Sequence, residues 1–71
     1  MNQLTKAEFE SYMDEIVNYL KLGLCTQRSL FFSHTRTSFS DLEKFAMPYR
    51  RHGYTVGIVS RPMEWEVYVT Y

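Results

Sequence analysis

The sequence has few of the residues that cross-link or interrupt a fold: its 71 residues include one cysteine, two prolines and three glycines. The lone Cys25 excludes an internal disulfide, so stability must come from the core, and a reducing compartment is the simplest location. No apolar run is long enough to span a bilayer, and the first residues lack the basic and apolar regions of a secretory signal. We therefore expect a cytoplasmic protein with no membrane association.

Net charge is also absent, because eight basic residues balance eight acidic ones. The whole molecule therefore has no net attraction for nucleic acid or for an anionic membrane. The charges are unevenly distributed, however: residues 1–24 carry two basic and four acidic side chains, and residues 26–61 carry six basic and two acidic ones. We expect one side of the folded protein to be more basic than the other.

Patterns that identify catalytic or metal sites are missing as well. Cys25, His34 and His52 include the residue types of a thiol nucleophile with its base, or of a metal site, but no two of them have the spacing of a ligand pair. There is no glycine-rich phosphate loop, and the carboxylates of residues 8–15 lie on a predicted helix surface. The sequence thus predicts no enzyme, no cofactor and no metal, with His34 as the residue to examine again.

Aromatic residues, by contrast, are abundant, with five phenylalanines, six tyrosines and one tryptophan. A chain this short buries only about 60% of its unfolded surface. Each aromatic side chain buries about 150–250 Å², so these residues supply the dense core that a small fold needs. The composition predicts a single domain over residues 1–71.

The first predicted helix has clear signals at both ends. Thr5 and Glu8 have the spacing of a capping box, and Gly23 is placed to adopt the left-handed conformation that ends a helix near Leu22. From Phe9 onward, apolar side chains recur at steps of three and four residues, which is typical of an amphipathic helix: Phe9, Tyr12, Met13, Ile16, Val17, Leu20 and Leu24.

A second helix is predicted ahead of Gly53, with two possible caps. Ser40 with Glu43 forms one capping box, and Ser38 with Asp41 is an alternative. The apolar face that follows consists of Phe39, Leu42, Phe45, Ala46 and Tyr49.

Pro48 complicates the end of this helix, because proline removes one backbone hydrogen bond and crowds the carbonyl of Lys44. We expect a kink or an early end there. Continuation to about Arg51 is the alternative, because cations in the last turn complement the helix dipole.

Three segments are predicted strands: Ser29–His34, Tyr54–Val59 and Trp65–Tyr71, the last two joined by a turn that contains Pro62. The order helix, strand, helix, strand, strand predicts an α+β fold. The longest strand, Trp65–Tyr71, suits the centre of the sheet, antiparallel to both of its neighbours. We predict a three-stranded mixed sheet in the order 1-3-2, which is a ferredoxin-like half, with two helices on one face.

Alternation along these strands predicts which side chains face away from the helices. This open face would carry Phe31, Val59 and Tyr68. A three-stranded sheet covered on one side also has two unprotected edges. We therefore expect a homodimer, formed either by edge pairing or by stacking of the open faces around these three residues.

Two alternatives compete for the exposed residues. Phe31 and Tyr68 on neighbouring strands resemble, in geometry, the stacking platform of RRM-type RNA-binding sheets, with Arg28, Arg36 and Arg61 at the strand ends. The sequence motifs of that family are absent. The other interpretation is that the same aromatic residues are buried in a dimer or cover the sheet.

Arg50 and Arg51 also have two interpretations. Adjacent guanidinium groups can bind a phosphate, but a basic last turn before a glycine is ordinary helix design.

The function predicted from these features is a small, non-enzymatic protein-protein interaction module that regulates or inhibits a host macromolecule. Its size and lack of motifs resemble those of accessory proteins of phages and mobile elements that block host machinery. The expected contacts are Phe31, Val59 and Tyr68, followed by Arg50 and Arg51. An RNA-binding or single-stranded nucleic-acid-binding protein that uses the aromatic sheet face is the alternative.

Overall fold

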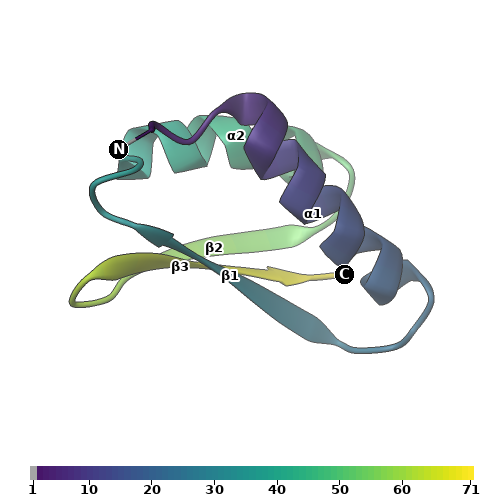
Figure 1. Cartoon of the computed structure of the whole chain (residues 1–71). Helices are drawn as coiled ribbons and strands as arrows, with labels where there is room; N and C mark the ends of the chain where they lie inside the picture. The colour runs from purple at the N-terminus through teal and green to yellow at the C-terminus, as the bar shows by residue number, and fades with distance from the viewer. Residues whose placement is uncertain (1) are drawn as a thin grey trace.

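The computed structural model describes residues 2–71 and confirms the predicted α+β class. Two helices lie on one face of a three-stranded sheet (Figure 1). The elements are α1 (Lys6–Lys21), β1 (Gln27–Ser33), α2 (Phe39–Arg51), β2 (Thr55–Ser60) and β3 (Glu64–Thr70).

The helix starts follow the capping chemistry of the sequence. The Thr5 hydroxyl accepts a hydrogen bond from the Glu8 backbone N–H, and the Glu8 carboxylate accepts one from the Thr5 N–H, which completes the capping box of α1. At α2 the two candidate caps are resolved in favour of Ser38, whose hydroxyl accepts from the backbone N–H of Asp41. Each cap satisfies a backbone donor that has no partner within the helix.

Both helices end at a glycine in the left-handed conformation. Gly23 has a φ of 73° and Gly53 has a φ of 94°. Glycine adopts such positive φ values with little steric strain because it has no Cβ atom. Helix α2 continues through Pro48 to Arg51, so the expected early end is wrong and the alternative of continuation is confirmed. Helix α2 therefore ends just before Gly53, whose left-handed conformation lets the chain change direction toward β2.

The sheet has the predicted order, β1-β3-β2, with β3 in the centre. β1 and β2 each pair antiparallel with β3, so every hydrogen-bonded ladder is antiparallel. The strands begin and end within two residues of their predicted bounds, and the predicted alternation is preserved. The helices therefore cover the face of the sheet that alternation predicted to be apolar.

The core lies between this face and the helices. Phe9 is fully buried, and its ring contacts those of Phe32, Phe45 and Tyr49 at centroid distances of 6.0, 5.6 and 6.2 Å. These contacts join α1 to β1 and α2. The buried apolar residues are Leu4, Phe9, Met13, Ile16, Leu20, Phe32, Leu42, Ala46, Tyr54, Val56, Val67 and Val69.

Candidate interaction surface

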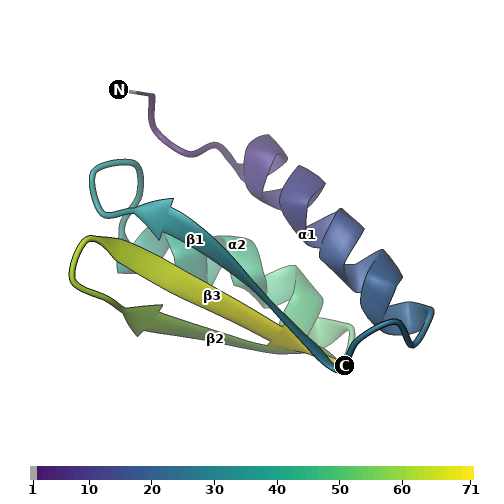
Figure 2. The ribbon, with the colours of Figure 1, turned by 60° about the horizontal axis from the view of Figure 1, so that its bottom comes forward.

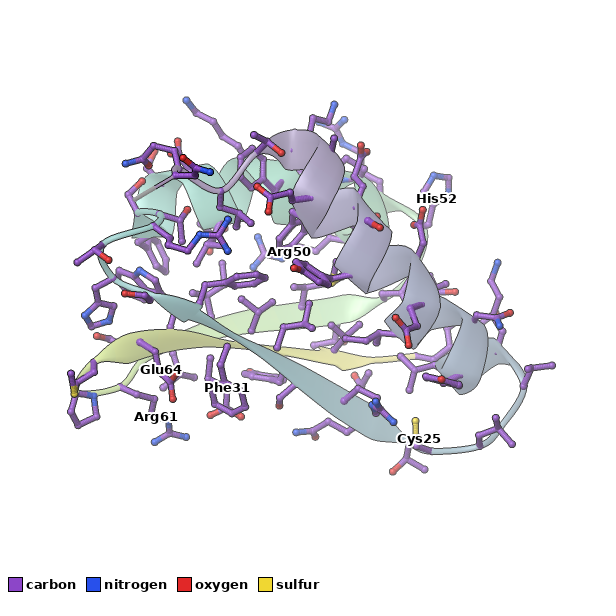
Figure 3. The ribbon with its side chains drawn as sticks, in the orientation of Figure 1. Cys25, Phe31, Arg50, His52, Arg61 and Glu64 are labelled. Atoms are coloured by element: carbon purple, nitrogen blue, oxygen red, sulfur yellow. The ribbon has the colours of Figure 1, made fainter. Side chains whose placement is uncertain are left out.

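The open face is the side of the sheet that no helix covers. Figure 3 shows Phe31, Arg61 and Glu64 projecting from this side, whereas Arg50 lies on the side of the helices. The side chains that alternation places on the open face come from all three strands: Gln27, Ser29, Phe31, Ser33, Thr55, Gly57, Val59, Glu64, Glu66, Tyr68 and Thr70.

One row across this face has a charged centre between two apolar ends. Phe31 on β1 and Val59 on β2 are both paired with Glu66 on β3. The Glu66 carboxylate accepts hydrogen bonds from the Ser29 hydroxyl at 2.9 Å and from the Arg61 guanidinium at 2.8 Å. The row therefore combines two apolar side chains with an ion pair.

The neighbouring row contains Tyr68, which covers a glycine. Tyr68 lies opposite Gly57 on β2, and its ring occupies the space where a Cβ of Gly57 would stand. An aromatic residue opposite a strand glycine compensates for the missing side chain in this way. The ring leans toward β2 and away from Phe31, so the predicted residues share a face but do not form one stacked pair.

Arg50 and Arg51 lie in different environments. Nε and Nη2 of Arg50 donate to the carbonyl oxygen of Val56 at 3.0 and 2.6 Å, and the guanidinium also pairs with Glu43. Arg51 is exposed. The Arg50 guanidinium therefore connects α2 to β2, and its hydrogen bonds to Val56 and Glu43 disfavour the interpretation in which Arg50 and Arg51 together bind a phosphate.

The three arginines expected at strand ends also have partners within the protein. Arg36 pairs with Glu8 at 3.0 Å, Arg61 pairs with Glu66, and the Arg28 guanidinium lies 4.9 Å from the centre of a tyrosine ring. That ring belongs to Tyr19 on α1. Contacts of this kind lower the tendency of a guanidinium to bind an external phosphate.

Cys25 and the two histidines are dispersed over the molecule. Cys25 lies half-buried between α1 and β1, His52 follows α2, and the His34 ring lies 4.5 Å from the ring of Trp65. Figure 3 shows Cys25 beside the loop that leads into β1, and His52 well apart from it at the end of α2. Within residues 2–71, no group of three His, Cys, Asp or Glu side chains has a geometry that could hold a metal ion.

Two tyrosines of the helix layer have different surroundings: Tyr49 is partly buried, and Tyr12 is exposed. The Tyr49 hydroxyl donates to the carboxylate of Asp14 at 2.9 Å, and burial together with this carboxylate raises the pKa of Tyr49. Tyr12 on α1 is 43% exposed and lines a hollow of about 260 Å³ together with Leu30, Phe31, Phe32 and Arg36. The sequence placed Tyr12 on the apolar face of the first helix but could not predict this hollow, which depends on how α1 packs beside β1.

Three ion pairs give the protein a defined response to acid. The pKa values of Glu8, Glu43 and Glu66 are lowered chiefly by hydrogen bonds from Arg36, Arg50 and Arg61 respectively. A carboxylate whose pKa is lower in the folded than in the unfolded state stabilises the fold fully only above its unfolded value. For these residues that ordinary value is 4.5.

We expect stability to be constant near neutral pH and to fall as the pH drops below about 4.5 and through the lowered pKa values. Urea unfolding at a series of pH values would measure this decrease. Glu66→Gln removes one of the three carboxylates and should make the decrease shallower. Equal stability at about pH 6 and pH 3 would contradict the contribution of these ion pairs.

Neither helix within residues 2–71 has the length and apolar character needed to cross a bilayer. No protein-family model matches the chain, and neither a curated protein nor a solved structure is significantly similar to it.

Proposed function

We propose that this chain is a small, non-enzymatic protein-interaction module that regulates or inhibits another macromolecule by docking on it. The observation that carries the proposal is the uncovered sheet face, on which Phe31 is 53% exposed. Exposed aromatic side chains beside apolar residues are typical of protein contacts. We place its action in the cytoplasm, with a host protein of a phage or mobile element as the kind of partner.

A homodimer formed through the open faces is part of this proposal. The open face presents Phe31, Val59 and Tyr68 beside both members of the Arg61–Glu66 ion pair. A surface that carries apolar groups and both signs of charge can be complementary to itself about a twofold axis. Stacking of these faces would cover the aromatic residues that the helices leave exposed.

Single-stranded nucleic acid is the second candidate ligand for the same face. Tyr68 and Phe31 both present aromatic groups, which would support base stacking. Glu66 lies between Phe31 and Val59 in the register, however, and it pairs with Arg61, so within residues 2–71 this ion pair leaves no unpaired cation beside the aromatic residues to attract a phosphate. We therefore rank a protein partner first.

Light scattering of Tyr68→Ala and Val59→Glu tests the dimer. The wild-type protein should have twice the chain mass of 8.5 kDa, and both variants should have the mass of one chain. Tyr71→Ala is the matched control, because this exposed tyrosine stacks on Tyr54 at the helix side of the sheet. Affinity capture from a native lysate should recover a partner with the control and lose it with Phe31→Ala, because the exposed ring of Phe31 is the feature on which this proposal depends.

Anisotropy titration with single-stranded RNA and DNA at two salt concentrations separates the two candidates. The protein-interaction proposal expects no saturable binding. Salt-sensitive binding that weakens by about 1–3 kcal/mol in Phe31→Ala or Tyr68→Ala would instead establish the nucleic-acid function.

A further inference from the structure

The free edge of β1 has backbone groups without partners in the sheet. In an antiparallel ladder, alternate residues direct both N–H and C=O toward the neighbouring strand. The His34 N–H donates to the Met63 carbonyl, which continues the β1–β3 register, so even-numbered residues of β1 bond β3. The N–H and C=O groups of Gln27, Ser29 and Phe31 therefore point outward.

The opposite edge of the sheet is different. The Arg61 N–H donates to the Glu64 carbonyl, which continues the β2–β3 register, so the odd-numbered residues of β2 bond β3. The backbone N–H and C=O groups of Val56, Ile58 and Ser60 therefore point outward from β2. Two N–H groups of the Arg50 guanidinium donate hydrogen bonds to the Val56 carbonyl oxygen. The β2 edge is thus partly blocked by a charged side chain, which is a common protection against strand pairing.

The hollow lined by Tyr12 wraps around the β1 edge, and we call it the edge groove. Tyr12 belongs to the helix layer and Phe31 to the open face, yet both line this hollow, together with Leu30, Phe32 and Arg36. Figure 1 shows α1 above the sheet, and Figure 2 shows it running along the outer side of β1. The groove therefore has a strand edge as one wall and the side of α1 as the other.

Among the residues that the structure describes, the edge groove has no unpaired charged side chain in its lining. Arg36 is held by both carboxylate oxygens of Glu8, at 3.2 and 3.0 Å, and Arg28 lies over the Tyr19 ring. Between these two contacts the lining is apolar or aromatic. The complementary ligand is an uncharged, apolar segment.

We propose that the edge groove binds an extended segment of a partner protein, which adds to the sheet as a strand beside β1. Main-chain hydrogen bonds to Ser29 and Phe31 would hold the segment. Two apolar side chains, separated by one residue, would point toward Tyr12, because side chains alternate along a strand. This inference rests on the proposed function and specifies the form of the partner.

A second copy of this chain does not fit the same place. Its β1 would bring its own α1 along the outer side of the strand, where the first α1 already overhangs the edge (Figure 2). A single extended segment without an attached helix avoids this overlap. The same addition of a peptide between a strand edge and a helix is a recognised mode of peptide binding.

Selection of short random peptides displayed on phage against the full chain supplies the ligand for the test. The enriched peptides should carry apolar residues at alternate positions. In hydrogen exchange, the best synthetic peptide should protect the amides of Ser29 and Phe31 by about tenfold or more. Absence of enrichment, or protection confined to other amides, would overturn the proposal.

Proline substitutions test the backbone contacts, because an outward N–H can be removed at a sheet edge without loss of the ladder. Ser29→Pro should weaken peptide binding by about tenfold or more, whereas Ser29→Ala, which keeps the N–H, should change it less than about twofold. Ser60→Pro makes the same change on the β2 edge and should leave binding intact. Equal binding by Ser29→Pro and Ser60→Pro would exclude the β1 edge.

Tyr12→Ala provides a variant that alters the groove from the helix side and leaves the strand unchanged. It should weaken peptide binding, while Tyr68→Ala and Val59→Glu on the open face should not. If the peptides bind all of these variants equally, the groove proposal fails. The proposed function then still stands or falls with its own measurements of mass and partner capture.

Discussion

Replacement of Phe9 by alanine is expected to remove a large part of the free energy of unfolding of this protein. The side chain is fully buried and contacts aromatic rings from β1 and α2. Truncation of a buried phenylalanine costs about 3–5 kcal/mol, because apolar area and packing are both lost. A chain of 71 residues has a total stability of about 4–11 kcal/mol. The loss therefore approaches the whole stability at the lower end of this range.

Thermal unfolding followed by circular dichroism would measure the effect. In a domain of this size, each 1 kcal/mol shifts Tm by about 4–8 °C, so Phe9→Ala should lower Tm by at least about 12 °C. Phe31→Ala is the matched control, since this ring is 53% exposed on the open face. A Tm for Phe9→Ala within a few degrees of the control would contradict the central role of Phe9 in the core.

The fold was predictable because its signals are local and agree with one another. Thr5 with Glu8 specifies a helix start, Gly23 and Gly53 specify two ends, and alternation specifies the faces of the strands. Pro48 is the exception. A single unfavourable residue does not end α2, because the helix is stabilised by packing of its apolar face more than by its propensity.

The candidate surface was only partly predictable. Alternation placed Phe31, Val59 and Tyr68 on one face, but the direction in which a side chain leans depends on its neighbours in space. Tyr68 leans over Gly57 because that position has no side chain. A tyrosine in one strand and a glycine in the next would have been a usable signal, had the strand register been known.

The charges were the least predictable feature. The sequence indicated a basic side, yet Arg36 and Arg61 each pair with a glutamate. Arg61 pairs with Glu66 across the turn between β2 and β3, whereas Arg36 pairs with Glu8, which is distant in the sequence and is brought close only by the tertiary packing. The surface is consequently more neutral than the uneven distribution of charge suggested, and this favours an apolar extended ligand over a phosphate backbone.

Replacement of Arg50 by alanine is expected to reduce stability and to increase self-association. The guanidinium donates twice to the Val56 carbonyl and pairs with Glu43. Hydrogen bonds from charged donors contribute about 1.5–3 kcal/mol, so we expect a loss in that range by urea unfolding. The Glu43 pair adds little to this figure, because both side chains are partly exposed to water.

The second effect follows from the position of Val56 on the free edge of β2. Without Arg50 its carbonyl has no partner, and the edge can pair with another chain. Light scattering should then detect species heavier than the wild type. Arg51→Ala, at an exposed neighbouring position, should alter neither stability nor mass. If both arginine variants lost equal stability, the contact between Arg50 and β2 would contribute nothing, and general charge at the end of α2 would be the cause.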